Sequence, residues 1–319
     1  MKVNTAYIKF IIALLIYGAN GIWIEQISLP TYQMVFLRTV LAVAVLLSIF
    51  LIARKKFTFH KKPKDFFFLA LSGLFLGGAW LSLFVAYKEG GIPFGTLAYY
   101  CGPVIVMALS PFVFKEKLTP TRVIGFVIAM TGVVLFNGQA FLTGVAPFGV
   151  FCGAVSACCA ACMIMFNKKA GRIDGLENPL LQMVFAFVAS GLFILITGNF
   201  EIHMQQSDIL PMLILGVVNT GFTGYLYFSS IIKLPAQTVA TVGYLEPLSA
   251  VLFSAIFLDQ HLTVLGIIGG ICILAGAFFA ESMAFRRSRK ESGVQAEIAA
   301  ENIKKSLSGG KKSLDGKNR

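Results

Sequence analysis

Two ionisable residues lie well inside apolar segments of this 319-residue chain, Arg38 and Glu246. A charge at the centre of a bilayer costs roughly 3 kcal/mol on insertion scales, so such a residue normally faces a cavity or a partner. Pro247 follows Glu246 and removes a backbone hydrogen bond, which loosens the helix there. Glu246 is therefore a candidate site for a proton or a cationic substrate. The alternative is a structural carboxyl satisfied by its neighbours.

Arg38 keeps its charge at physiological pH. It either binds an anionic substrate group, holds a carboxylate of the protein, or has a structural role. Further polar and aromatic residues in the apolar segments of the chain fit the wall of a metabolite cavity. These candidates are Asn20, Trp80, Tyr99, Tyr100, Asn219, Tyr225 and Tyr244. Helix packing or an interfacial belt is the alternative for such residues, and it is the stronger interpretation for Trp23 and Tyr227.

Motifs for metal or nucleotide chemistry are absent from the sequence. His60, His203 and His261 lie in connections between apolar segments, without metal-site spacing, and no phosphate-binding glycine loop occurs. The C-x-x-C spacing of Cys159 and Cys162 lies in an apolar run, where small residues favour helix packing. We therefore expect no metal, no cofactor and no enzymatic activity.

The composition shows which elements must position these residues. Hydrophobic residues make up 57% of the chain and charged residues only 13%, about half the charged fraction of soluble domains. Since about 20 apolar residues cross a bilayer as a helix, we predict an all-α integral membrane protein with ten transmembrane helices. They are 6–24, 31–52, 66–87, 94–114, 123–142, 147–166, 179–197, 209–231, 236–257 and 264–283, with breaks at Pro30, Pro63, Pro120, Pro147, Pro179 and Pro235.

The net charge of +12 is concentrated at the ends of these helices. The second, fourth, sixth and eighth connections carry six, three, three and one Lys or Arg, whereas the other five carry only Lys88. Basic connections stay in the cytoplasm, so we expect a multi-pass protein of the plasma (inner) membrane with both termini cytoplasmic. This placement of charge also argues against a nucleic-acid partner. Membrane lipid and a small molecule are the expected partners of a monomer or homodimer.

The second half of the sequence repeats the first. With a shift of 144 residues, 91–136 aligns with 235–280 at eight identical positions. They are Tyr100 with Tyr244, Pro103 with Pro247, Ser110 with Ser254, Leu118-Thr119 with Leu262-Thr263, Ile124-Gly125 with Ile268-Gly269, and Gly132 with Gly276. Upstream, Gln33-Met34-Val35-Phe36 recurs as Gln182-Met183-Val184-Phe185.

Five helices per repeat is an odd number, so the two copies must cross the membrane in opposite directions. The basic segment 54–64 corresponds to the segment around Glu201 and Asp208, which lacks Lys and Arg, as inversion requires. We predict a first repeat over 1–142 and a second, inverted repeat over 147–284. The basic remainder, 285–319, is expected to be a disordered cytoplasmic tail, with an interfacial helix on anionic lipid as the alternative.

These residues resemble the EamA-type transporters of the drug/metabolite transporter superfamily over roughly 6–283. The segments that carry the resemblance are Phe36-Leu37-Arg38, Pro103 through Lys115-Glu116-Lys117-Leu118-Thr119 to Gly125 and Gly132, and Tyr244-Leu245-Glu246-Pro247 through Asp259 and Leu262-Thr263 to Gly269 and Gly276. The sequence departs from the family at Asp259-Gln260-His261, where a Gly-Glu pair is common.

The resemblance implies a secondary transporter that moves a small organic metabolite by alternating access. An amino-acid-like substrate and export are what it most suggests. It also implies a structural role for Arg38, since the family places arginine there across different substrates. The alternatives from other classes are an intramembrane lipid-modifying enzyme, which would need a second acid or base beside Glu246, and a non-transporting lipid-binding scaffold.

Overall fold

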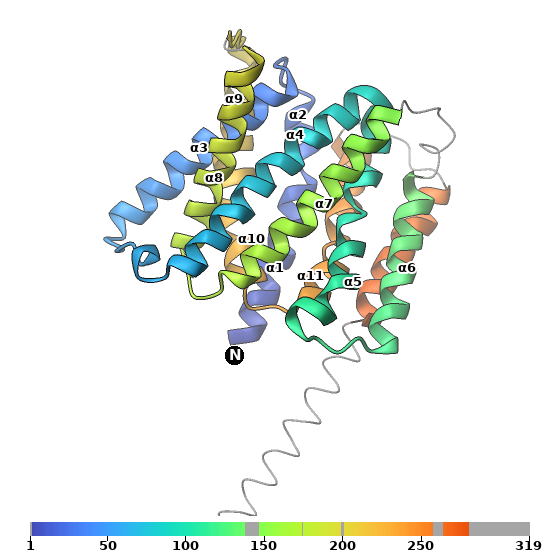
Figure 1. Ribbon diagram of the computed structural model, residues 1–319. Coiled ribbons are helices and arrows are strands. Elements are labelled where there is room, and N and C mark those ends of the chain that lie inside the picture. The colour runs from blue at the N-terminus through green and yellow to red at the C-terminus, as the bar shows by residue number, and fades with distance from the viewer. Residues whose placement is uncertain (1, 138–146, 174, 199–200, 258–263, 281–319) are drawn as a thin grey trace, which may run out of the picture.

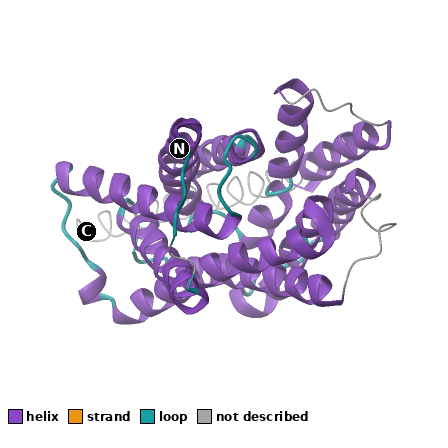
Figure 2. Ribbon diagram, turned by 90° about the horizontal axis from the view of Figure 1, so that it is seen from above, coloured by secondary structure: helices purple, strands orange, loops and turns teal. Residues whose placement is uncertain are grey.

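The computed structural model describes residues 2–137, 147–173, 175–198, 201–257 and 264–280, and within these ranges all regular secondary structure is helical (Figures 1 and 2). The expected tail, 285–319, lies outside the described residues. Six helices are long and apolar enough to cross a membrane: Thr5–Ile24, Thr31–Ile52, Pro63–Glu89, Pro147–Lys169, Glu177–Thr197 and Gln206–Ile231. Shorter apolar helices are Gly102–Phe114, Pro120–Leu135 and Val264–Ala280. A multi-pass helical membrane protein is thereby confirmed, and the count of ten spans stays a prediction.

The helices of the two halves of the chain have the following bounds. The first half comprises α1 (Lys2–Gly18), α2 (Asn20–Ile24), α3 (Thr31–Ile52), the 3₁₀ turn η1 (Phe59–Lys61), α4 (Pro63–Tyr99), α5 (Gly102–Phe114) and α6 (Pro120–Asn137). The second half comprises α7 (Pro147–Lys169), α8 (Glu177–Thr197), the 3₁₀ turn η3 (Gln206–Asp208), α9 (Ile209–Leu213), the π-helix η4 (Ile214–Phe222), α10 (Thr223–Ile231), α11 (Ala236–Val242), α12 (Leu245–Phe257) and the unlabelled helix Val264–Ala280.

Proline sets several helix starts where the sequence predicted breaks. Pro63, Pro120 and Pro147 are the first residues of α4, α6 and α7, where a missing N–H costs nothing because the first turn has no intrahelical acceptor. Pro30 and Pro235 immediately precede α3 and α11.

Four predicted spans are interrupted within their length. Ala19 separates α1 from α2, Tyr100 and Cys101 separate α4 from α5, and Gly243 and Tyr244 separate α11 from α12. In the fourth, the chain widens into the nine-residue π-helix η4 between α9 and α10. Long π stretches are rare and are often found at functional sites.

One predicted connection is helical in the structure. The sequence placed a connection at 88–93, between helices 66–87 and 94–114, but α4 continues to Tyr99 and the break falls at Tyr100 and Cys101. Gly and Pro weaken a helix without forbidding it, so this Gly- and Pro-containing stretch does not by itself mark a helix end.

The two halves pack in matching ways. α1 packs against α10 and α12, and its counterpart α7 packs against α4 and α5. In the same way α3 packs against η4, and its counterpart α8 packs against α4. Figure 1 shows α3 and α8 toward one edge of the molecule and α6 beside the helix Val264–Ala280 at the other.

Four glycines bring α6 and the helix Val264–Ala280 into backbone contact. A methyl group on Gly125 would lie 2.6 Å from the carbonyl oxygen of Gly276, and one on Gly132 would lie 2.5 Å from that of Gly269. Only glycine permits such an approach. Gly125 meets Gly276, whereas Gly132, further along α6, meets Gly269, which is earlier in the other helix. The two helices therefore run antiparallel.

Candidate substrate site

Arg38 is held by two side chains from other helices. It lies on α3 with only 6% of its surface exposed. Its Nε donates to Thr220 Oγ1 of η4 (2.9 Å), and its guanidinium carbon lies 4.3 Å from the ring centroid of Trp80 on α4. The Thr220 hydroxyl donates in turn to the carbonyl oxygen of Leu215 (2.7 Å), so its oxygen is oriented to accept from Arg38. The sequence had singled out Arg38 and Trp80 separately, and the structure brings them together.

Glu246 is the carboxyl group that lies within electrostatic reach of Arg38. It lies in the first turn of α12, just after the interruption at Gly243 and Tyr244, and is half-buried. Among the residues that the structure describes, its carboxylate has neither a hydrogen bond nor an ion pair, although its charge interacts electrostatically with that of Arg38. The expected position, away from the ends of the span, therefore coincides with a helix break.

Two tyrosines complete this group. Tyr17 of α1 and Tyr99 at the end of α4 are half-buried, and both interact electrostatically with Arg38 and with Glu246. We call the six side chains the central group: Tyr17, Arg38, Trp80, Tyr99, Thr220 and Glu246. Tyr100 also lies within electrostatic reach of Glu246, is buried, and packs edge-on against Tyr99 with ring centroids 5.7 Å apart.

Asn219 bridges two of the helix interruptions. Its Nδ2 donates to the carbonyl oxygen of Ile16 (3.1 Å) and to Asn20 Oδ1 (3.0 Å). The Ile16 carbonyl lies where α1 breaks, so the amide satisfies a backbone group next to the break. The structure thus brings together the two predicted asparagines, Asn20 and Asn219, and ties η4 to the break in the first span.

Two predicted residues lie elsewhere. Tyr244 is fully buried and its hydroxyl contacts Met130 Sδ (3.2 Å) and the carbonyl oxygen of Tyr100 (3.4 Å), so it packs between helices. Tyr225 accepts a hydrogen bond from Lys9 Nζ (3.3 Å), and the Lys9 ammonium lies 4.8 Å from its ring centroid.

The sequence did not point to two residues of the central group, Thr220 and Tyr17. Thr220 is adjacent to the predicted Asn219, and Tyr17 lies three residues before the predicted Asn20, so their proximity was the available signal. Lys9, the partner of Tyr225, was also not singled out, because it lies near the start of the predicted helix 6–24.

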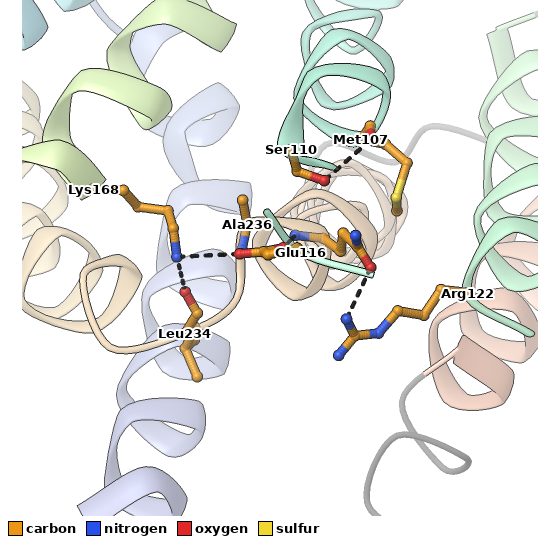
Figure 3. A network of polar contacts seen from close by, with 8 residues as sticks. Met107, Ser110, Glu116, Arg122, Lys168, Leu234 and Ala236 are labelled. Carbon is orange, nitrogen blue, oxygen red and sulfur yellow. Dashed lines mark hydrogen bonds and ion pairs between the residues drawn. The ribbon is translucent and has the colours of Figure 1, made fainter. Parts of the chain in front are cut away.

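A separate polar network ties down the start of α11 (Figure 3). Glu116, between α5 and α6, accepts hydrogen bonds from the backbone N–H groups of Ala236 (2.7 Å) and Gln237 (3.2 Å). Lys168 of α7 lies 3.7 Å from the Glu116 carboxylate and donates to the carbonyl oxygen of Leu234. Glu116 thus supplies, from another segment, the acceptor that the first turn of α11 lacks.

A cleft of about 520 Å³ lies away from the central group, between the connection before α3 and the connection after α8. Its lining includes Ser28, Pro30, Gln33, Glu201 and His203. Within the described ranges, no three His, Cys, Asp or Glu side chains converge as metal ligands would.

An all-helical membrane fold with interrupted spans, and with an arginine and a carboxyl group inside them, is the architecture of a multi-pass membrane transport protein. The chain belongs to the EamA-like transporter family, whose model matches residues 4–138 and again residues 147–281. The family domain is therefore present twice, as the internal repeat predicted.

Individual relatives agree with this assignment. The uncharacterized transporter YxxF of Bacillus subtilis (strain 168) is 27% identical over 282 residues, covering 86% of this chain and 88% of its own. A protein of Salmonella typhimurium (strain LT2) named "probable amino-acid metabolite efflux pump" is 28% identical over 232 residues, covering 68% and 77%. Human solute carrier family 35 member G1 is 23% identical, covering 65% and 60%. One solved crystal structure, 20% identical, superposes with a TM-score of 0.76 over 86% of this chain and 98% of its own, which shows the same fold.

Proposed function

We propose that the protein is a secondary active transporter that moves a small organic metabolite across the plasma membrane by alternating access. The observation that carries the proposal is the Glu246 carboxyl group, which lies half-buried at a helix break without a hydrogen bond or ion pair from the described residues. Such a group is available to a proton or to a cationic substrate group. We further propose an amino-acid-like substrate and outward transport, which the name of the Salmonella typhimurium relative supports.

The moving parts in this proposal are two inverted five-helix repeats, 1–142 and 147–284. The glycine contacts support the inversion. Under the 144-residue shift, Gly125 corresponds to Gly269 and Gly132 to Gly276, and the observed contacts join Gly125 to Gly276 and Gly132 to Gly269. Exchanging the two copies maps one contact onto the other, and the equivalent helices run antiparallel. An axis lying in the membrane plane produces this arrangement, and repeats of this kind rock against each other in transporters.

The central group is suited to such motion because both halves contribute to it. Arg38, Trp80, Tyr17 and Tyr99 come from the first family domain, whereas Thr220 and Glu246 come from the second. A relative movement of the two halves therefore changes the surroundings of the charged groups. The basic connections place both termini in the cytoplasm in this proposal.

Flux measurements in proteoliposomes test the proposal. Proteoliposomes that contain the wild-type protein or the Glu246→Gln variant are loaded with a mixture of amino acids and related metabolites. Efflux is followed by mass spectrometry, with and without a pH gradient. We expect selective flux in the wild type and impaired flux in Glu246→Gln, because the amide keeps the shape and removes the charge. Glu201→Gln, which changes an exposed carboxylate, serves as the matched control.

Two results would count against the proposal. Absence of selective flux in the wild type would favour a lipid-binding scaffold. Normal flux with unchanged pH dependence in Glu246→Gln would remove Glu246 from the mechanism. The enzyme alternative has less support, because it needs a second acid or base beside Glu246. Among the described residues, the side chains in electrostatic contact with Glu246 are Arg38 and tyrosines, and none of them is a carboxylate.

A further inference from the structure

The Arg38 guanidinium has hydrogen-bond donors that the described protein does not use. Arginine carries five N–H donors, and here Nε is bonded to Thr220 while the other N–H groups have no acceptor among the residues that the structure describes. The contact with Trp80, 4.3 Å from the guanidinium carbon to the ring centroid, is a cation–π contact and provides no hydrogen-bond acceptor of the carbonyl or carboxylate kind. A nearly buried cation with unused donors in this geometry matches a carboxylate, which arginine binds through two parallel hydrogen bonds.

Within the described part of the chain, Glu246 lacks a hydrogen-bond donor as partner, whereas the remaining N–H groups of Arg38 lack acceptors. Its carboxylate can accept several hydrogen bonds and receives none from the described side chains. The obvious partner would be Arg38, yet no nitrogen of Arg38 lies within 4.0 Å of a Glu246 carboxylate oxygen. The Arg38 and Glu246 side chains interact electrostatically with each other, and both also interact with Tyr17 and Tyr99. A group with a negative and a positive end would satisfy both residues at once.

We propose that Arg38 and Glu246 are the two ends of a binding site for a zwitterion, with the substrate carboxylate on Arg38 and its ammonium group on Glu246. This inference rests on the proposed transport function and assigns the residues that bind the two charged ends of its amino-acid-like substrate. It also assigns Glu246 to direct recognition of the ammonium group. Trp80 and Thr220 are positioning residues, because they hold the guanidinium and have no assigned contact with the ligand.

Binding to purified protein in detergent tests the inference without requiring flux. Each of the twenty L-amino acids is screened for stabilisation against thermal unfolding, and the best ligand is compared with its methyl ester and its N-acetyl derivative. We expect each derivative to bind wild-type protein at least tenfold more weakly, because each removes one charged end and leaves a buried charge unpaired. The ester lacks the negative end, and the N-acetyl derivative lacks the positive end.

Substitutions then assign the ends. In Arg38→Gln the parent and its methyl ester should bind equally weakly, while the N-acetyl derivative remains weaker still. In Glu246→Gln the pattern should reverse, with the penalty for N-acetylation lost and that for esterification kept. Arg122→Gln is the control, since Arg122 lies outside the central group and bonds to Gln237. It should keep the wild-type order of ligands.

Stability without ligand separates recognition from a purely internal ion pair. If Arg38 and Glu246 serve only each other, each single variant loses thermal stability, the double variant recovers it, and both charged ends of the ligand become irrelevant. That result would overturn the inference. So would wild-type protein that binds the methyl ester as tightly as the parent. Failure of every amino acid to bind, alongside selective flux of another metabolite in proteoliposomes, would overturn the zwitterion site and leave the transport proposal standing.

Discussion

Glu116 offers a direct test of how firmly the start of α11 is held. Its carboxylate, 17% exposed, accepts two backbone N–H bonds and faces Lys168, which is 10% exposed (Figure 3). Glu116→Gln keeps the size of the side chain but leaves one acceptor oxygen, and its amide N–H₂ then faces a backbone donor. Hydrogen bonds to a charged group are worth roughly 1.5–3 kcal/mol and neutral ones about 1 kcal/mol.

The expected loss is therefore about 2 kcal/mol, after discounting the charged terms for partial exposure. Since 1.4 kcal/mol corresponds to a factor of ten, the open form of this network should become about thirtyfold more populated. Lys168 reports the opening, because its ammonium is engaged by Glu116 and Leu234 in the closed form. Acylation of lysines in detergent-solubilised protein, read by mass spectrometry, measures its reactivity.

The neighbouring Lys117 is exposed and serves as an internal reference in the same sample. We expect the rate of Lys168 acylation relative to Lys117 to rise in Glu116→Gln by roughly one order of magnitude or more, as the estimate above implies. Glu201→Gln, whose carboxylate is 89% exposed, should leave the ratio unchanged. An unchanged ratio in Glu116→Gln would refute the reasoning, because the hydrogen bonds would then not be what keeps Lys168 closed.

Two further predictions concern packing and orientation. Gly125→Ala should lower the thermal unfolding temperature in detergent, at a cost of roughly 1–3 kcal/mol, because its methyl group would meet the Gly276 carbonyl. Gly21→Ala, with nothing within 4 Å of the added methyl group, should not lower the unfolding temperature. Equal losses in the two variants would contradict the close contact between α6 and the helix Val264–Ala280. In a cysteine-free background, His60→Cys should react with an impermeant maleimide only after permeabilisation and His203→Cys in intact cells. Labelling of position 60 in intact cells would contradict the predicted orientation.

The sequence predicted the backbone framework well because its signals are local or repeated. Proline marks helix starts through its missing N–H, and α4, α6 and α7 begin at prolines where breaks were predicted, although α4 and α6 start three residues before the predicted 66 and 123. The glycines conserved between the two halves, such as Gly125 and Gly269, proved to be contact points between helices. Charge inside an apolar span is equally local, which is why Arg38 and Glu246 could be selected without a structure.

The faces of the helices could not be predicted in the same way. A span that is apolar all round carries no amphipathic signal, so nothing in the sequence distinguished Tyr99, which lies in the central group, from Tyr244, which packs against Met130. The π-helix escaped prediction because its composition resembles that of an α-helix. The contact between Asn20 and Asn219 joins residues 199 positions apart, and no local pattern encodes it.

The two copies share a backbone design but not their charges. Both are interrupted at the same repeat position, Tyr100 in one and Tyr244 in the other, whereas the residue that corresponds to Glu246 under the same shift is Gly102. A methyl group on Gly102 would already lie 3.2 Å from the carbonyl oxygen of Ala157, so the close packing of α5 on α7 leaves no room for a carboxylate there.

The same divergence holds for the arginine. By the alignment of Gln33–Phe36 with Gln182–Phe185, Arg38 corresponds to Phe187, whose ring packs against Phe36 with centroids 5.4 Å apart. Each copy thus supplies one charge at a position where the other supplies a packing residue. If both charged residues had been duplicated along with the helices, the protein would contain two such arginines and two such carboxyl groups. With one charge from each copy, the central group is complete only when both copies are present, and a movement between them changes the distance between the opposite charges.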